Sequence, residues 1–512
     1  MKLTQEQSRI CNSKGDIKIN AVAGSGKTTT IIEYAGAQSP ESKILYLAFN
    51  RAVKLEARKR FKDRGLANVR VETAHSLAYQ AIVLHTDLVL KASGYHIHEI
   101  ADVLRLKVNH EKHTEYIIAN HINKFISYYC NSTAESLKEL NYLEVISDPA
   151  ARDFVSSFYK YIEKHTMRML AMMEQGSIPI NHDYYLKRFQ MSKPVLDYDV
   201  LLFDEGQDAS SAMLDVFFNQ RGTRVIVGDI HQQIYGWRFA VNSLQKANFK
   251  NLYLSTSFRF SQDIADLAMA VLSWKQIIGV DTSLKITGSG TACGIKTKAV
   301  IARTNLGLLL KAIEFISTES RSKRIYFEGH FNSYTYADEG ASLYDVLHLY
   351  NNKRRYIRDK LIRKMSSMKE LEEYIDKSDD GQLAMMVDIV KEYKNRIPGL
   401  IREIKRRHLE PEERNKASMI FSTVHRCKGM EYDLVHIVDD FITADKLEMQ
   451  VKGGTLGQLE IDKLNEEINL LYVAITRTRN RVEIPESLIP EGVLRSEFIR
   501  VLEAEHREAT AQ

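Results

Sequence analysis

The stretch INAVAGSGKTTT, residues 19–30, decides the fold of this chain. The apolar residues before it predict a β-strand, and the residues from Thr28 onward predict a helix. The loop AGSGK between them has the strand–loop–helix setting in which backbone N–H groups and a helix N-terminus bind phosphate. The pattern G-x-x-x-x-G-K-[ST] has glycine where this chain has Ala21, but the inner Gly24 and Gly26 are present. We therefore predict a nucleotide phosphate site; a glycine-rich turn with a chance lysine is the alternative.

The loop residues divide the phosphate chemistry between them. Lys27 is expected to reach the β- and γ-phosphates, and the Thr28 hydroxyl to hold Mg²⁺. The candidate nucleotide contacts are Ala23, Gly24, Ser25, Gly26, Lys27, Thr28 and Thr29.

A phosphate loop of this kind needs acidic residues at the end of a second strand, and VLLFDEGQD, residues 200–208, supplies them. The apolar run predicts a buried strand that carries Asp204 and Glu205 to the carboxyl edge of the sheet, where ligands bind in open α/β folds. Asp204 suits Mg²⁺ coordination, and Glu205 suits activation of the attacking water. Two adjacent acids at a surface turn are common, but together with AGSGKT they predict a nucleoside triphosphatase.

Composition narrows the class of protein. The 512 residues are 44% hydrophobic and 27% charged, which is typical of a globular protein of several domains. No run of eighteen apolar residues and no signal-peptide core are present, so we expect no membrane partner and a cytoplasmic location, or a nuclear one in a eukaryote. The cysteines form no C-x-x-C pair, which disfavours a zinc or disulfide framework; they are Cys11, Cys130, Cys293 and Cys427.

The charge pattern hints at a polyanionic partner. The net charge is +5, and residues 51–64 and 353–364 are dense in Lys and Arg. A solvated helix face explains either run equally well.

Strand and helix patterns alternate at two places, which predicts an α/β protein with two RecA-like P-loop domains. The strands are expected at residues 16–22, 43–49, 69–75, 200–206 and 223–229, and then at 252–257, 299–305, 324–329, 419–425 and 434–441. The predicted domains are 1–77 with 181–252 (1A, the ATP site), a helical insertion 78–180 (1B), 253–331 with 416–490 (2A), a small helical insertion 332–415 (2B), and a C-terminal tail 491–512.

The box DEGQD resembles the D-E-x-Q-D motif of superfamily 1 helicases of the UvrD/Rep/PcrA kind. Other stretches then resemble the remaining motifs in the family's order: LTQEQ, YLAFNRAVKLEA, VETAHSLAY, VIVGDIHQQIYGWR, SFRF, STVHRCKGMEYD and EEINLLYVAITRTR. The resemblance implies ATP and Mg²⁺ as cofactors. It implies nucleotide contacts at Gln7, Phe258 and Glu431, and γ-phosphate contacts at Gln232, Arg259 and Arg477.

The resemblance also implies movement on single-stranded DNA, 3′-to-5′, with unwinding at junctions between single and double strands. We expect ATP in a cleft between the two α/β domains, closed by both arginines. Tyr235 and Trp237 are candidates to stack on bases, with a buried core tryptophan as the alternative for Trp237. The full set of implied DNA contacts is Asn50, Thr73, His75, Tyr235, Trp237, Arg238, Thr423 and His425.

In detail, HQQIY, YLAFNRAV and RIPGLIREIKRRH are similar to the helicase part of the F-box DNA helicases. Two residues precede Leu3, so we expect no F-box and transfer no ubiquitin-ligase role. Phe258 stands where many relatives have a tyrosine that stacks on adenine, so the ring is kept and the hydroxyl is lost. The second insertion is short compared with that of UvrD. For that reason UvrD's rules of autoinhibition are not transferred to this chain.

Three alternatives stay open. The chain can be an ATP-switched regulatory or sensor subunit of a DNA repair or defence complex, with a protein partner and little unwinding. It can be a translocase that removes proteins from DNA, or it can act on RNA. A nuclease is disfavoured because about thirty residues follow the last motif.

Overall fold

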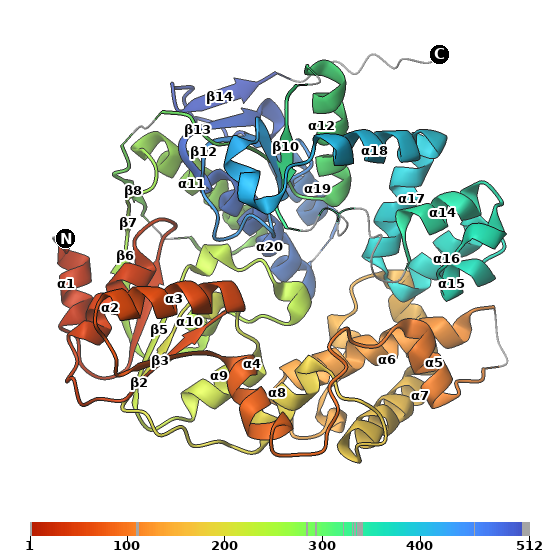
Figure 1. The fold of residues 1–512 in the computed structure, drawn as a ribbon, viewed down its shortest axis with the longest axis horizontal. Helices are drawn as coiled ribbons and strands as arrows, with labels where there is room; N and C mark the ends of the chain where they lie inside the picture. The colour runs from red at the N-terminus through yellow and green to blue at the C-terminus, as the bar shows by residue number, and fades with distance from the viewer. Residues whose placement is uncertain are drawn as a thin grey trace. The chain divides into compact units, whose positions relative to one another are not determined.

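The chain folds into two units, each built around a parallel β-sheet (Figure 1). The computed structural model describes residues 3–108, 112–282, 285–291, 294–320, 322–329, 331, 334, 341–454 and 456–503. The first unit is Met1–Ala21, Gly26–Leu254 and Lys360–Gly381; the second is Val22–Ser25, Ser255–Asp359 and Gln382–Gln512. The predicted α/β class with two parallel sheets is confirmed.

The sheet of the first unit has the strand order β3-β2-β4-β5-β1-β6, and all its pairs are parallel. Two of its inner strands, ILYLA at residues 44–48 and VLLF at residues 200–203, are continuous buried apolar runs, as expected where both faces of a parallel sheet are covered. The strands are β1 (Ile17–Ala21), β2 (Ile44–Ala48), β3 (Val69–Thr73), β4 (Val200–Phe203), β5 (Thr223–Gly228) and β6 (Lys250–Leu254).

Helices α2 and α3 lie on one side of this sheet and α9 on the other (Figure 1). Helix α1 begins with a capping box, in which Thr4 and Gln7 exchange backbone-to-side-chain hydrogen bonds. The elements are α1 (Gln5–Cys11), α2 (Lys27–Gly36), α3 (Arg51–Asp63), η4 (Gly206–Asp208), α9 (Ser211–Phe218), η5 (Ile230–Gln232), η6 (Gly236–Arg238) and α10 (Ser243–Lys246).

The chain between β3 and β4 is mainly helical where the structure describes it, with an isolated β-bridge between Leu90 and Ile180. The elements are α4 (Ala74–Ala78), η1 (Tyr79–Val83), α5 (Ile97–Leu104), α6 (Thr114–Asn131), η2 (Leu137–Glu139), η3 (Tyr142–Val145), α7 (Pro149–Glu174) and α8 (His182–Met191).

Two helices from much later in the chain, α15 (Lys360–Lys364) and α16 (Met368–Ser378), also belong to this first unit. Side chains of α6 bind the carbonyls at the end of α16: Asn120 donates to Ser378 O at 2.8 Å, and Lys124 donates to Asp379 O at 2.8 Å. The sequence predicted residues 332–415 as one insertion of the second domain. The structure instead groups Lys360–Gly381 with the first unit. The α6 side chains satisfy the carbonyls at the end of α16, which have no partner within that helix.

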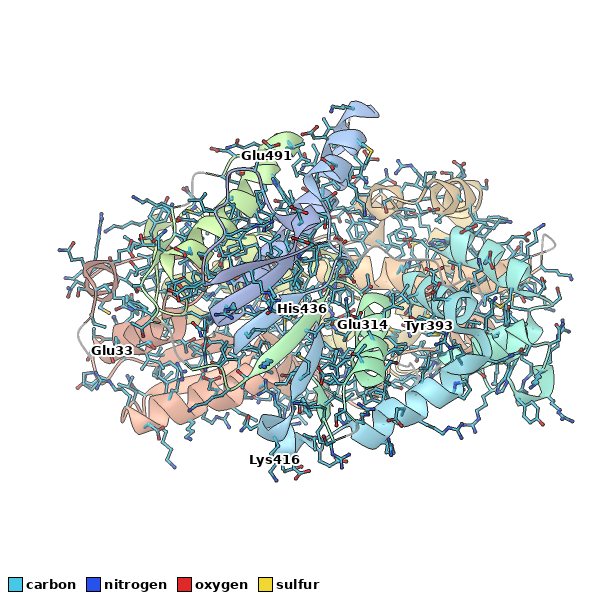
Figure 2. The ribbon with its side chains drawn as sticks, turned by 90° about the horizontal axis from the view of Figure 1, so that it is seen from above. Glu33, Glu314, Tyr393, Lys416, His436 and Glu491 are labelled. Carbon is cyan, nitrogen blue, oxygen red and sulfur yellow. The ribbon has the colours of Figure 1, made fainter. Side chains whose placement is uncertain are left out.

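The sheet of the second unit has the order β10-β11-β9-β12-β13-β14 and is also parallel. His436 on β12, labelled in Figure 2, lies with Nδ1 3.4 Å from Oε2 of Glu483 on β13. The strands are β9 (Lys298–Ala302), β10 (Ile325–Phe327), β11 (Met419–Thr423), β12 (Tyr432–Ile437), β13 (Thr478–Pro485) and β14 (Ile499–Leu502). A separate pair joins β7 (Thr256–Ser257) and β8 (Thr287–Gly288).

The second unit also contains helices. They are α11 (Gln262–Ser273), η7 (Trp274–Ile278), α12 (Asn305–Thr318), α14 (Leu343–Tyr350), η8 (Arg354–Tyr356), α17 (Gly381–Tyr393), η9 (Lys394–Arg396), α18 (Ile397–Arg407), η10 (Pro411–Lys416), α19 (Ala444–Lys452), α20 (Gln458–Ile475) and η11 (Glu486–Leu488). Of these, α12 and α20 contact strands of the sheet. Gly381, the first residue of α17, is grouped with the first unit.

The carboxyl end differs from the predicted tail over residues 491–512. Ile499–Leu502 forms β14, because its backbone pairs with β13 from Val482 to Pro485. Residues 504–512 lie outside the described ones, as do Cys293 and residues 332, 333 and 335–340 of the predicted insertion. In the part of the chain that the structure describes, no helix is long and apolar enough to span a bilayer.

Candidate nucleotide and nucleic-acid sites

The phosphate loop ends at Gly26, whose backbone is left-handed (φ 77°) directly before the first residue of α2. The side chain of Gln7 lies beside it, because a Cβ added at Gly26 would be 3.3 Å from Gln7 Nε2. Gln7 is buried, and its Nε2 finds no hydrogen-bond partner among the described residues. A buried amide donor without a partner costs about 1–3 kcal/mol. The Gln7 amide therefore lies next to the phosphate loop with a hydrogen-bond donor that a bound nucleotide could satisfy.

Lys27 and the two acidic residues meet at the carboxyl edge of the first sheet. Lys27 Nζ lies 3.7 Å from Glu205 Oε1. Asp204 follows β4 and is buried; its burial, followed by the charge of Glu205, raises the pKa of its carboxyl to about 6. Thr28 and Thr29 are half-buried in the first turn of α2. The oxygen donors of Thr28 and Asp204 are of the kind that Mg²⁺ prefers, so this set fits the ion.

A chain of hydrogen bonds leads from Glu205 to Gln232. Gln207 Nε2 donates to Glu205 Oε2 at 2.5 Å, and the Asp229 backbone N–H donates to Gln207 Oε1 at 3.2 Å. Gln232 Nε2 then donates to Asp229 Oδ2 at 2.8 Å. Gly228 leaves room for this path, because a Cβ at that position would lie 2.2 Å from Gln207 Oε1 and would displace the amide. Sequence reasoning missed Gln207 and Asp229, although both stand within the quoted motifs.

Tyr235 and Trp237 follow Gln232 in the chain; Tyr235 is half-buried and Trp237 is exposed. Trp237 is 61% exposed, so the alternative of a core tryptophan is wrong. The Arg238 guanidinium lies 4.5 Å from the centroid of the Trp237 ring. Tyr235 stacks on Phe49, with ring centroids 5.6 Å apart and planes inclined by 22°. Phe49 is an aromatic neighbour that the sequence analysis did not single out.

Three other predicted DNA contacts of the first unit lie near helix starts. Asn50 caps α3 by accepting from the Val53 N–H, and Thr73 caps α4 in a capping box with Ser76. Burial lowers the pKa of the His75 imidazole. The side chains of Asn50 and Thr73 already have a structural role as helix caps. Their contact with DNA therefore stays a prediction.

The tip of the phosphate loop, Val22–Ser25, packs within the second unit. Gly24 (φ 73°) accepts a hydrogen bond at 2.9 Å from the Phe258 N–H, and a Cβ at Gly24 would lie 2.6 Å from the Arg259 Cβ. Ala23 and Ser25 are buried beside it. Glycine is thus needed at Gly24 for both its backbone angle and this close approach.

Arg259 is held by Glu431. Its Nε and Nη2 donate to Glu431 Oε1 at 3.0 and 2.6 Å, and Nη1 donates to the Thr476 carbonyl at 2.7 Å. Burial and the charge of Arg477 lower the pKa of Arg259 to about 10, against the opposing effect of Glu431. The guanidinium therefore keeps its charge at neutral pH.

Arg477 is buried, and its Nε donates to the Val473 carbonyl at 3.0 Å. Glu431, predicted as a nucleotide contact, pairs with Arg259 and also with Arg479 Nε at 2.9 Å. The Phe258 ring is 44% exposed and open to stacking. Thr423 is buried at the end of β11, and His425 is half-buried just beyond it.

Residues 3–252 match the UvrD/REP helicase N-terminal domain. The matched stretch contains the phosphate loop, Asp204, Glu205 and Gln232.

Several proteins similar to this chain are named as DNA helicases. The chain is 29% identical to F-box DNA helicase 1 of Gallus gallus over 98% of this chain and 51% of that protein. It is 28% identical to F-box DNA helicase protein 1 of Schizosaccharomyces pombe, over 97% of this chain and 59% of that protein. DNA helicase II of Haemophilus influenzae is 22% identical over 54% of this chain and 40% of that protein. The chain thus spans about half the length of the F-box relatives it matches.

Proposed function

We propose that this chain is an ATP-dependent DNA helicase or translocase that moves 3′-to-5′ on single-stranded DNA and separates strands at junctions. The hydrogen-bonded path from Glu205 through Gln207 and Asp229 to Gln232 carries the proposal. It ends three residues before Tyr235, so one short segment connects the hydrolysis residues with an aromatic surface.

In this proposal Lys27 and the backbone around Gly26 bind the phosphates, and Gln7 donates to the base. Thr28 and Asp204 hold Mg²⁺, which supplies charge neutralisation on the phosphates when bound. Glu205 takes the proton of the attacking water. Arg259 and Arg477 stabilise charge that develops on the γ-phosphoryl group.

The same proposal assigns DNA to the exposed aromatic surface. The Trp237 ring and the Arg238 guanidinium beside it offer stacking and positive charge, a combination that binds single strands without reading sequence. The relatives' names carry the words DNA helicase, which supports DNA as the nucleic acid. A role in DNA repair belongs to this proposal too.

Strand separation on 3′-tailed, 5′-tailed and blunt DNA, with an RNA control, tests the function. We expect ATP-dependent unwinding of the 3′-tailed duplex and little of the others. Equal unwinding of 5′-tailed DNA contradicts the polarity. ATP-dependent DNA binding without unwinding supports instead a regulatory subunit or a translocase that removes proteins.

Replacing Trp237 with alanine is expected to lower unwinding about tenfold or more, because one stacking contact contributes roughly 1–3 kcal/mol per base. ATP hydrolysis without DNA should remain, because the Trp237 ring is exposed and has no proposed contact with the nucleotide. Unwinding rates and DNA-free ATP turnover are measured on the same preparation.

The matched control is Trp274→Phe, because the Trp274 side chain is buried in the second unit. Equal losses of unwinding and basal turnover in Trp237→Ala contradict a stacking role.

A further inference from the structure

Tyr46 approaches the acidic residues from a neighbouring strand. It lies in the middle of β2 and is fully buried, and its hydroxyl forms a hydrogen bond with Asp204 Oδ2. An ionised carboxylate only accepts hydrogen bonds, so the phenol is the donor. Tyr46 and Asp204 are 158 residues apart in the chain.

Two further hydrogen bonds fix Asp204. Its Oδ1 accepts from the Glu205 backbone N–H at 2.9 Å, and its own N–H donates to the Leu47 carbonyl of β2 at 3.1 Å. Among the described residues, each carboxylate oxygen therefore has one donor, and rotation of the carboxylate would break the bond to Tyr46. A carboxylate oxygen accepts about two hydrogen bonds, so each oxygen keeps a lone pair for a cation.

The core determines where the Tyr46 hydroxyl lies. Strand β2 is held between β3 and β4, with Tyr46 in register with Val71 and Leu202. The ring packs edge-on against Phe61 of α3, with centroids 5.3 Å apart. The donor is therefore placed by the sheet and by α3 before any nucleotide binds.

We propose that Tyr46 is a positioning residue for the Mg²⁺–nucleotide complex. Its hydroxyl holds the Asp204 carboxylate in the orientation that receives the cation. The inference rests on the proposed role of Asp204 in Mg²⁺ binding. Partners that orient a metal-binding group change metal affinity or activity by about 10–100-fold when they are removed.

Replacing Tyr46 with phenylalanine removes the donor and keeps the ring. We expect the Mg²⁺ concentration at half-maximal binding of a non-hydrolysable ATP analogue to rise about tenfold or more. Binding of the analogue without Mg²⁺ should be unchanged. In ATP turnover, the Mg²⁺ requirement should rise by the same factor, and excess Mg²⁺, or Mn²⁺ as a tighter-binding substitute, should restore much of the rate.

Tyr34→Phe is the matched control, because Tyr34 is also a buried tyrosine of the same apolar cluster. The ionisable groups near its hydroxyl are the Asp16 carboxylate and the Cys11 thiol rather than Asp204. Thermal unfolding of both variants separates lost stability from lost Mg²⁺ affinity. An unchanged Mg²⁺ midpoint in a folded Tyr46→Phe chain overturns the inference.

Two further variants keep the inference testable. In an Asp204→Asn background, Tyr46→Phe should have no additional effect on the Mg²⁺ midpoint, because the carboxylate it orients is gone. If Tyr46→Phe fails to fold, Phe61→Leu loosens the ring while keeping the hydroxyl, and it should raise the midpoint several-fold; no rise overturns the inference. If the unaltered chain shows no Mg²⁺-dependent binding of the analogue, the proposed function fails instead.

Discussion

Replacing Glu205 with glutamine is expected to slow ATP turnover by about 10²- to 10⁴-fold, because the amide cannot accept the proton of the attacking water. The fold should survive, since a glutamine oxygen can still accept the hydrogen bond from Gln207. Nucleotide binding should also survive, because Lys27 and the loop are unchanged. Single-turnover ATP hydrolysis and analogue binding, measured side by side, check the two expectations.

The control for this change is Glu33→Gln, which also removes one carboxylate charge from the first unit (Figure 2 labels Glu33). Glu33 pairs with Arg64 at 2.7 Å, and both side chains are partly exposed. Such surface pairs contribute little, about 0–1 kcal/mol. Turnover by Glu205→Gln at the rate of the unaltered chain would mean that another group is the base.

Replacing Arg259 with alanine is expected to lower the maximal rate of ATP hydrolysis by about 10³-fold, the lower end of the effect of an arginine that stabilises a phosphoryl transition state. The Arg259 backbone lies against Gly24 of the phosphate loop, and its guanidinium is buried and charged. Arg259→Lys should recover little, because lysine lacks the planar fork that contacts Glu431 through two nitrogens. The rate at saturating ATP and the affinity for an ATP analogue are the measurements.

Arg303→Ala controls for the loss of a paired arginine in the same unit. Arg303 contacts Glu467 through Nε and Nη2, in the way that Arg259 contacts Glu431. If Arg259→Ala and Arg303→Ala lose similar stability but only Arg259→Ala loses turnover, Arg259 acts at the phosphate. If both variants lose the same turnover, Arg259 only supports the fold.

Much of the candidate site could be predicted because its residues are close in sequence. Lys27 and Thr28 begin α2 directly after the loop, and Asp204 and Glu205 follow a buried strand of four residues. The positions of these residues follow from backbone rules that act over a few neighbours. Most strands of both sheets follow from apolar runs in the same way. The run at 252–257, predicted for the second domain, is an exception, because Lys250–Leu254 pairs with β1 and forms β6 of the first sheet.

Other features could not be read from the sequence. The edge strand β14 is only four residues long, too short for an apolar run to distinguish it from a tail, and its pairing with β13 defines it. In the sequence, Phe49 cannot be told from other apolar residues; the structure shows its ring stacked on Tyr235. The burial of Arg477 likewise depends on the helix and strand that meet around it.

The sequence alone determined the two parallel α/β layers, the phosphate loop and the acidic pair, because glycine geometry, apolar runs and helix starts depend on adjacent residues. Only the tertiary structure decided that Tyr46 reaches Asp204, that Gln207 connects Glu205 with Asp229, and that α16 packs on α6. These contacts join residues from separate strands and helices. Their formation depends on strand order and packing, which no local pattern of residues specifies.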